Sequence, residues 1–420
     1  MSSVSYDPML PDVRRDPYPH YAELRRKAPV AFIESTGFWA VARQRDVHEV
    51  LRSPDRFSSG PMRFIRTNGR PPANPMEAAG NIRAESLARM LEQLPFPAFE
   101  LATARSVIYA DPPGHTPLRA IVNRGFTPRR VAALEPRVRA IARECLAGAR
   151  RKGELDLVTD LAIPLPVTVI CELLGVDPER RDDFKRWSDA IVTSQTAGAE
   201  APPSSAIPEL ILYLAEVIER RRREPREDLI STLLRAEEGE TLKPAEVVTF
   251  ALLLLVAGNE TTTNLLGNAL LALTEHPAEL ERVRRDPALV PALVEEVLRY
   301  DSPVQLLWRE ATRDVELAGV SIPKGSIVVP LLGSANRDDE AFPGADRFEV
   351  TRERPTHLAF GFGVHFCLGA SLARLEARVA LEELLALPRV TRKPGTRPER
   401  LDAFMLRGLR SLPLVLDTAG

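Results

Sequence analysis

Four long stretches of the chain carry apolar residues at every third or fourth position, which is the spacing of one buried face of an α-helix. These stretches are residues 136–149, 209–223, 241–274 and 372–387. Shorter apolar patterns bounded by glycine and proline predict strands within 30–41, 315–329 and 412–416. We therefore expect a mainly α protein with a small β region. No repeat or low-complexity linker interrupts this pattern, which predicts a single domain over residues 1–420.

Composition narrows the functional classes. With 420 residues and 44% hydrophobic content the chain can bury a large core, and a net charge of −2 without a basic tract argues against nucleic-acid binding. The N-terminus lacks the layout of a signal peptide, and the longest apolar run, 250–257, is too short to span a membrane. We expect a soluble cytoplasmic protein without a membrane anchor.

Three cysteines occur, Cys145, Cys171 and Cys367, and their spacing suggests neither a disulfide framework nor a zinc site. Cys367 lies in residues 360–369, FGFGVHFCLG, where glycines allow a tight turn and a predicted helix begins just after the cysteine. Backbone N–H groups at such a helix start favour a thiolate, which can be the axial ligand of a haem iron. A buried structural cysteine is the simpler alternative. A cysteine hydrolase is disfavoured, because His365 is only two residues away on a tight loop.

The 360–369 segment resembles the haem-binding signature of the cytochrome P450 superfamily. The matching positions are Phe360, Gly361, His365, Cys367 and Gly369. Residues 296–299 (EVLR), 342–348 (FPGADRF), 257–262 (AGNETT) and 111–119 (DPPGHTPLR) resemble four further elements of that family in order and spacing. The resemblance extends from about residue 15 to the C-terminus. It implies the P450 fold, haem b as cofactor and Cys367 as the ligand of its iron.

The resemblance also implies roles for polar residues. His115, Arg119, Arg309 and His365 match positions that contact the haem propionates, where cations and donors compensate buried carboxylates. Each one alone is more typical of a surface charge. Glu296, Arg299 and Arg347 correspond to a buried Glu-Arg-Arg network that holds the fold, whereas an exposed helical pair is the simpler interpretation of the first two.

The segment AGNETT implies oxygen chemistry. Ala257 and Gly258 are small where dioxygen would bind, while Glu260 and Thr261 would manage the protons that oxygen cleavage consumes. The simpler alternative is a polar end to an apolar helix.

Two irregular stretches are expected to be flexible lids, residues 58–117 and 195–208. The first holds an apolar stripe that predicts either a lid helix or an ordinary surface helix, and the second resembles the family's mobile loop or is a plain connector. The stripe consists of Ile82, Leu87, Met90, Leu91 and Leu94.

Together these features predict a bacterial monooxygenase that uses dioxygen to hydroxylate an apolar small molecule of terpenoid, steroid, fatty-acid or polyketide type. By family position, the substrate pocket would include Leu253, Leu254, Val304, Gln305, Leu306, Leu307, Phe404, Met405 and Leu406. The sequence has no flavin, nicotinamide or iron–sulfur motif, so we expect electrons from a ferredoxin and a ferredoxin reductase. We expect a monomer. A peroxide-driven peroxygenase and a non-enzymatic haem-based ligand sensor are the alternatives.

A basic face is a further expectation for partner docking. The arginines assigned to it are Arg124, Arg129, Arg130, Arg374 and Arg378.

Overall fold

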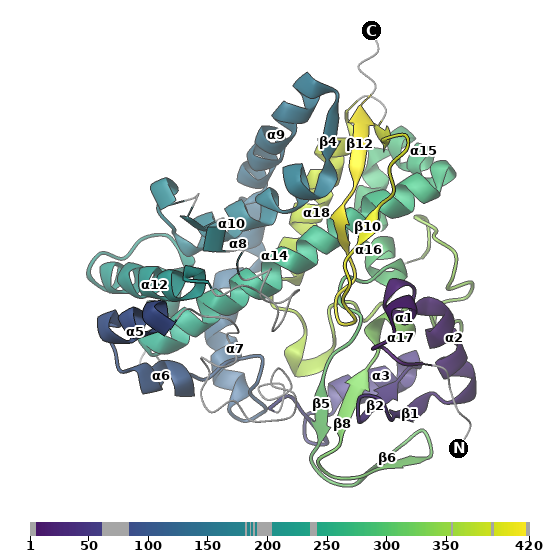
Figure 1. Cartoon of the computed structure of the whole chain (residues 1–420), viewed down its shortest axis with the longest axis horizontal. Coiled ribbons are helices and arrows are strands. Elements are labelled where there is room, and N and C mark those ends of the chain that lie inside the picture. The colour runs from purple at the N-terminus through teal and green to yellow at the C-terminus, as the bar shows by residue number, and fades with distance from the viewer. Residues whose placement is uncertain are drawn as a thin grey trace. The chain divides into compact units, whose positions relative to one another are not determined.

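The computed structural model describes residues 6–60, 84–180, 183–184, 186–187, 190, 204–235, 242–353, 356–387 and 390–416. The chain forms two compact units. The first contains residues 1–59, 131–165 and 261–420, and the second contains residues 60–130 and 166–260. Helices dominate and strands are short, so the predicted mainly α fold class is confirmed (Figure 1).

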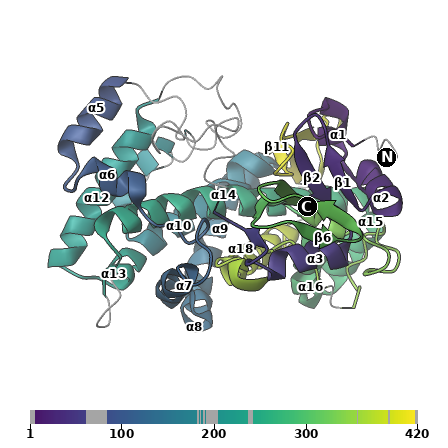
Figure 2. The same ribbon diagram turned by 90° about the horizontal axis from the view of Figure 1, so that it is seen from below.

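The second unit is helical. Helix α5 packs on α12, and Figures 1 and 2 both show the two side by side. Met90 on α5 is fully buried whereas Leu91 is exposed, so only part of the predicted stripe faces the protein. Ile82 and residues 195–203 lie outside the described residues. The helices here are α5 (Ala84–Gln93), α6 (Ala98–Thr103), α7 (His115–Asn123), α12 (Ala206–Arg223) and α13 (Leu229–Leu234), with α8 (Pro128–Ala133) at its border.

The first unit has helices on a small β region. Helix α18 packs on both α9 and α16. Its buried apolar residues include Leu372, Leu375, Val379 and Leu384. The helices are α1 (Pro11–Arg15), α2 (Tyr18–Lys27), α3 (Gln44–Arg52), α9 (Glu135–Lys152), α15 (Pro277–Arg285), α16 (Val290–Tyr300), α17 (Leu332–Ala335) and α18 (Ala370–Leu385).

The strands of the described residues belong to the first unit. The largest sheet has the order β1-β2-β8-β5-β3. Strands β2 and β8 are parallel, and every other neighbouring pair in this sheet is antiparallel. Its apolar face packs on α3 through Val47, Val50 and Leu51. The strands are β1 (Val30–Ile33), β2 (Phe38–Val41), β3 (Phe57–Ser58), β4 (Glu154–Asp156), β5 (Arg309–Ala311), β6 (Val315–Leu317), β7 (Val320–Ile322), β8 (Ile327–Pro330), β9 (Val390–Arg392), β10 (Glu399–Arg400), β11 (Leu409–Ser411) and β12 (Pro413–Leu416).

Besides α8, two longer helices pass from one unit into the other, α10 (Pro164–Leu174) and α14 (Pro244–Glu275). Helix α14 has 32 residues and starts at a cap in which Glu246 accepts a hydrogen bond from the Lys243 N–H (2.8 Å). It stops at Glu275, two residues before Pro277, because proline cannot continue a helix. By length and composition α14 could cross a membrane, but 59% of its most apolar window is buried inside the protein, as in the core helix of a globular protein.

Candidate active site

The Cys367 loop connects a short 3₁₀ turn, η7 (Gly363–His365), to α18 in the first unit. The Cys367 N–H donates to the Phe360 carbonyl (2.9 Å), which closes the loop on itself. The Cys367 carbonyl then accepts a hydrogen bond from Ala370 N–H at the start of α18 (3.4 Å). The cysteine therefore sits on a rigid turn directly before a helix N-terminus, a position that stabilises negative charge on sulfur.

Gly363 makes this loop possible. Its φ is +72°, and a Cβ there would lie 2.8 Å from the Leu51 carbonyl oxygen of α3. Gly361 has φ +70° but meets its nearest neighbour, Leu307, at an ordinary 3.8 Å. Gly363 is thus required both for its backbone conformation and for its close approach to α3.

An ionic cluster lies against Phe360 at the start of the Cys367 loop. The Arg374 guanidinium lies 4.5 Å from the centroid of the Phe360 ring and pairs with both oxygens of Glu295 (2.6 and 2.9 Å). Burial alone would raise the pKa of Glu295, but hydrogen bonds from His357 and Arg374 lower it to about 2. The carboxylate therefore stays charged and holds Arg374 against the loop. The sequence analysis did not find Glu295 or His357, because no spacing distinguishes them from surface residues.

The loop fits a flat apolar cofactor with a thiolate-bound metal. Cys367 is half-buried, while Phe362 and Phe366 beside it are 37% and 41% exposed although they are large and apolar. A half-buried cysteine in a loop that also carries exposed apolar side chains suits the side of a haem that carries the thiolate. The site residues of this loop are thus compatible with haem.

A buried network lies near α16. Glu296 and Arg299 are 1% and 0% exposed and form a two-pronged pair (2.8 and 2.9 Å). Arg299 also donates to three carbonyls, those of Asn336, Ala345 and Arg347. The exposed-pair interpretation is therefore wrong.

The second arginine of this network differs from the prediction. Arg352, not Arg347, brings its guanidinium to Glu296 (3.4 Å), and Arg347 contributes its backbone carbonyl instead. The reason is local: the Arg347 guanidinium packs against Gly344, close to where a Cβ would be. The prediction of Arg347 as the second arginine is therefore corrected to Arg352.

The expected propionate ligands lie in both units. In the first unit, Arg309 is 4% exposed on β5 and donates to the Trp308 carbonyl (2.7 Å), while His365 is half-buried in η7. In the second unit, His115 is buried at the first turn of α7, where burial and then Arg119 lower its pKa. Arg119 follows one helical turn later, and its Nε donates to Asn123 (3.1 Å).

Helix α14 carries the residues expected for oxygen chemistry. Ala257 is exposed and Gly258 half-buried, and a Cβ on Gly258 would lie 2.8 Å from the terminal methyl group of Ile170 on α10, so a larger residue there would require that side chain to shift. Glu260 is 6% exposed, and burial raises its pKa to about 7. A carboxyl with that pKa can both take up and release a proton at neutral pH. Thr261 follows it directly.

Two predicted pocket segments lie side by side in the first unit. Val304 forms a β-bridge with Leu406, and the Gln305 N–H donates to the Met405 carbonyl (2.8 Å). Leu306 is fully buried, and Leu307 is half-buried. In the second unit Leu253 and Leu254 are half-buried on α14.

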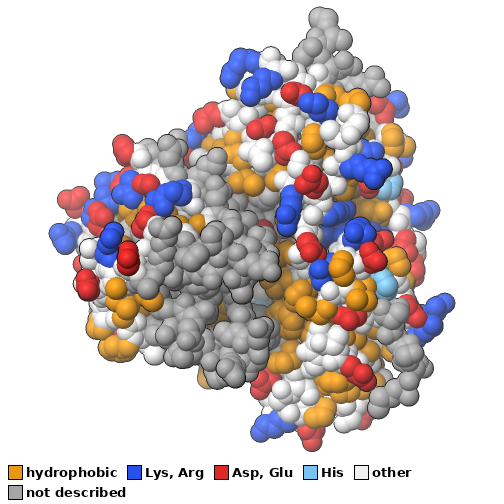
Figure 3. Space-filling view, viewed as in Figure 1, with side chains coloured by type: hydrophobic (Ala, Val, Ile, Leu, Met, Phe, Trp, Pro, Cys, Tyr) orange, Lys and Arg blue, Asp and Glu red, His pale blue; other side chains and the backbone are white. Residues whose placement is uncertain are grey.

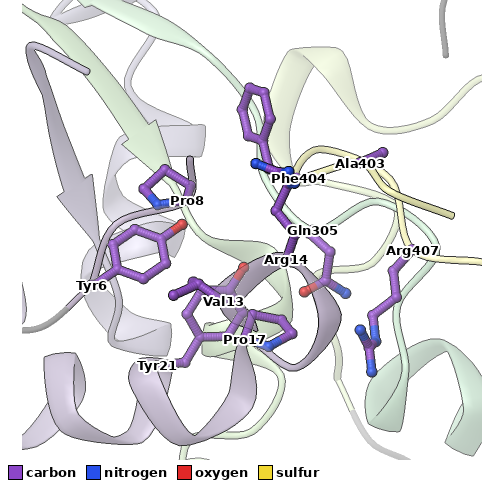
Figure 4. A pocket seen from close by; sticks show the side chains of 10 residues that line it. All are labelled: Tyr6, Pro8, Val13, Arg14, Pro17, Tyr21, Gln305, Ala403, Phe404 and Arg407. Atoms are coloured by element: carbon purple, nitrogen blue, oxygen red, sulfur yellow. The ribbon is translucent and has the colours of Figure 1, made fainter. Parts of the chain in front are cut away.

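Gln305 and Phe404 also line a small cavity, with Gln305 between Phe404 and Arg407 (Figure 4). The cavity measures about 10 Å³ and has room for one water molecule, so it is not a substrate site.

Two arginines of the predicted basic face are paired with acids. Arg374 pairs with Glu295, and Arg378 pairs with Glu135 and Glu382, so the charges of both are compensated. On the face shown in Figure 3, acidic and basic side chains are interspersed. An uncompensated patch is therefore not formed by these two arginines.

Comparison with known proteins agrees with this geometry. The family model for cytochrome P450 matches residues 204–415. The chain therefore belongs to the cytochrome P450 family, and it is a monooxygenase of the kind found in bacteria.

Several relatives match nearly the whole length of this chain. It is 45% identical to CYP109Q5 from Chondromyces apiculatus, with a TM-score of 0.85 over 99% of this chain and 98% of that one. It is 37% identical to CYP109E1 from Bacillus megaterium in complex with corticosterone, with a TM-score of 0.82 over 97% and 100%. It is 39% identical to the vitamin D(3) 25-hydroxylase of Pseudonocardia autotrophica, over 96% and 94%.

Proposed function

We propose that this monooxygenase carries haem b and hydroxylates an apolar substrate of about the size of a steroid. The observation that carries the proposal is the Cys367 loop, in which a half-buried cysteine precedes a helix start and the same segment carries the exposed apolar side chains of Phe362 and Phe366. The overall reaction consumes one dioxygen, two electrons and two protons, converts a C–H group to C–OH and releases one water. Haem, when bound, supplies the binding and reductive activation of dioxygen.

Individual side chains take distinct roles in this proposal. Cys367 is the iron ligand, and Phe360, Gly361 and Gly369 shape the loop around it. Arg309 and His365 of the first unit, and His115 and Arg119 of the second, are the propionate ligands. Arg309 and His115 are buried donors suited to that role, since a buried carboxylate is costly without cationic partners.

Two residues of α14 transfer protons in this proposal. Glu260, with a pKa of about 7, takes a proton from solvent and passes it on, while the Thr261 hydroxyl donates a hydrogen bond toward the oxygen site beside Ala257 and Gly258. We expect Thr261→Ala to bind haem and substrate but to divert reductant to hydrogen peroxide. Coupling of reductant to product that equals that of the wild type would contradict this role.

The substrate class is supported by the apolar segments and by relatives. Leu306, Leu307 and Phe404 offer no charge, which favours an apolar ligand over a polar one. Two relatives carry steroid-type names or ligands, vitamin D(3) and corticosterone. We infer that a steroid-like compound is accepted by this chain as well.

Electrons come, in this proposal, from a ferredoxin and its reductase in the cytoplasm, and the enzyme acts as a monomer. Arg129 and Arg130 of the second unit are candidate docking cations in this proposal. Omission of the ferredoxin should abolish turnover, and the peroxygenase alternative predicts instead that hydrogen peroxide alone restores it.

The first experiment is the spectrum of the reduced protein with carbon monoxide. A red-shifted Soret band would establish thiolate ligation, and Cys367→Ser should remove it. Corticosterone is then titrated, and a shift of the Soret band to the high-spin position followed by a hydroxylated product in mass spectra supports the substrate class. Haem without the red-shifted band would overturn the role of Cys367, and binding without product would favour the ligand sensor.

A further inference from the structure

A buried ionic cluster in the first unit has no part in the function proposed above. Asp301, directly after α16, is 5% exposed, and both of its carboxylate oxygens bind arginine. The Arg407 Nε donates to Oδ1 (2.6 Å) and Arg400 donates to Oδ2 (3.0 Å), while the Tyr18 hydroxyl of α2 also donates to Oδ1 (2.8 Å). Burial alone would raise the pKa of Asp301, but the charges of Arg407 and Arg400 lower it well below its usual range. The carboxylate is therefore ionised and joins parts of the chain that are far apart in sequence.

Arg407 connects this cluster to a loop, residues 401–408, which joins β10 to β11. Its guanidinium binds Asp301 through Nε and the Arg15 carbonyl through Nη1 (2.9 Å). Its backbone N–H donates to the Pro303 carbonyl (2.8 Å). A single residue thus fastens the 401–408 loop through both its side chain and its backbone.

Helix α14 contacts the same end of the loop. Asn268 is fully buried, and its Nδ2 donates to the Arg407 carbonyl (2.9 Å). Gly408 lies so close to this helix that a Cβ would collide with the side-chain amide of Asn264. The absence of a side chain at Gly408 therefore permits a close approach of the loop to α14 that other residues would prevent.

The 401–408 loop is paired with a predicted pocket segment. Leu406 forms a β-bridge with Val304, and the Gln305 N–H donates to the Met405 carbonyl (2.8 Å). These contacts immediately precede Arg407 along the chain. Loss of its ion pair would therefore make local opening of the adjoining backbone hydrogen bonds easier.

The same pocket segment contacts the Cys367 loop. The Leu307 Cδ1 lies 3.8 Å from the place that a Cβ on Gly361 would take. The segment that pairs with the 401–408 loop thus also contacts the loop proposed to hold the haem. A displacement of the 401–408 loop would change the shape of the pocket on this side.

Stability does not by itself explain the Asp301 cluster. Replacement of a buried ion pair by apolar residues of similar size is often neutral or stabilising, because the burial of charges is costly. An arginine fork, however, presents its N–H donors in a rigid planar arrangement, so it binds its acceptors in few geometries. Such a cluster is suited to hold a loop in a single position.

We propose that Arg407 is a positioning residue for specificity, which fixes the 401–408 loop to Asp301 so that the apolar side chains of residues 404–406 hold a substrate in one orientation. The inference rests on the proposed function, which assigns these side chains to the substrate pocket. Loss of the guanidinium should alter which carbon is hydroxylated, whereas hydroxylation itself should continue.

The test uses Arg407→Met, Arg407→Lys and Arg400→Met in the haem-loaded protein. In the first variant the Asp301 carboxylate keeps its hydrogen bonds from Arg400 and Tyr18. Arg400→Met is the matched control, because it removes the same charge from the same carboxylate at a position that the pairing of β10 with β11 holds in place. Lysine keeps the charge but lacks the planar fork that reaches both Asp301 and the Arg15 carbonyl, so it should restore wild-type behaviour only in part.

Substrate orientation is measured with corticosterone, from the ratio of its hydroxylated products together with KM and kcat. We expect this ratio to change about tenfold in Arg407→Met, which corresponds to one hydrogen bond to a charged group, and KM to rise more than kcat falls. Arg400→Met should keep the wild-type ratio, and the red-shifted carbon monoxide band should remain in all variants. An unchanged ratio in Arg407→Met would overturn the inference. If that variant does not fold, Arg407→Lys decides, since a smaller shift of the ratio supports the inference and no shift overturns it.

A second readout does not depend on the substrate. The backbone amide protons at positions 305 and 407 donate to the Met405 and Pro303 carbonyls, and hydrogen exchange reports how often these bonds open. Both should exchange about tenfold faster in Arg407→Met than in the wild type and in Arg400→Met. Equal exchange rates would overturn the inference whatever products are formed.

Failure of the proposed function is seen separately. If the wild type forms no hydroxylated corticosterone, the proposed substrate class is wrong, and the exchange rates alone then support or overturn the anchoring by Arg407. If the wild type hydroxylates corticosterone and Arg407→Met gives the same products, only the inference about Arg407 is wrong.

Discussion

Replacement of the buried Glu376 of α18 by glutamine should make the protein more stable, and by an amount that grows with pH. The ordinary pKa of 4.5 applies in the unfolded chain, and the folded-state pKa is about 8. Between these values unfolding releases a proton, so the contribution of this group to stability is complete below pH 4.5 and is lost as the pH rises through 8. The slope is about 1.4 kcal/mol per pH unit. Glutamine has no proton to release, so the substitution should remove this dependence of stability on pH.

The magnitude follows directly. At pH 7 the pH lies 2.5 units above the unfolded-state pKa of 4.5, which corresponds to a loss of about 3.4 kcal/mol of folding stability. At pH 5 the corresponding loss is less than about 1 kcal/mol. For 420 residues an unfolding entropy of about 0.9 kcal/mol/K converts these values into a Tm difference of about 4 °C at pH 7 and about 1 °C at pH 5.

The assay is the thermal midpoint by circular dichroism of haem-loaded wild type and Glu376→Gln, at several pH values from 5 to 8. Glu281→Gln, at an exposed position of α15, corrects for the loss of one formal charge. A Tm difference that does not change with pH would refute the reasoning, because a carboxyl that is already ionised in the folded state produces no such slope.

Two further changes test the fold around the site. Glu296→Gln leaves the fully buried Arg299 without its carboxylate, which should cost about 3–5 kcal/mol and give soluble protein with little or no haem, whereas a full haem content measured by absorbance would contradict this. Gly363→Ala adds a Cβ 2.8 Å from the Leu51 carbonyl at φ +72°, so it should lower Tm and haem content more than Gly325→Ala, which has φ +79° in open space; equal losses would mean that crowding by α3 is unimportant.

The helices and the Cys367 loop could be predicted because local signals determine them. Apolar periodicity located α9, α12, α14 and α18, and the motif at 360–369 located the loop before α18. The pairing of Glu296 with Arg299 was also accessible, since residues three apart on a helix face each other.

Other features depend on irregular backbone. Arg347 and Arg352 are five residues apart in a segment without periodicity, and the turn at Gly344 decides which of them reaches Glu296. No sequence pattern reports such a turn geometry. Glu376 is different: its place on the apolar stripe between Leu375 and Val379 was a readable signal, a charged residue on a buried helix face, and the sequence analysis missed it.

Buried acids give the clearest link between stability and chemistry in this chain. Among the described residues, Glu246, Glu296, Asp301 and Glu383 are each buried and each paired with arginine. Pairing keeps such a carboxylate ionised, as for Glu246, where hydrogen bonds from Arg105 and Lys243 outweigh the effect of burial and lower the pKa. The pKa values of Asp301 and Glu383 are lowered as well, so these three acids stay ionised near neutral pH.

Glu260 and Glu376 are the contrast within the same described residues, because neither has a cationic partner and burial raises the pKa of both, to about 7 and about 8. Near neutral pH both carboxyls, one on α14 and one on α18, therefore carry a proton in part or in full, in contrast to the arginine-paired Glu246, Asp301 and Glu383. Glu260 lies directly before Thr261 on α14. Raised pKa values are typical of functional sites, and that of Glu260 supports its proposed role in proton delivery.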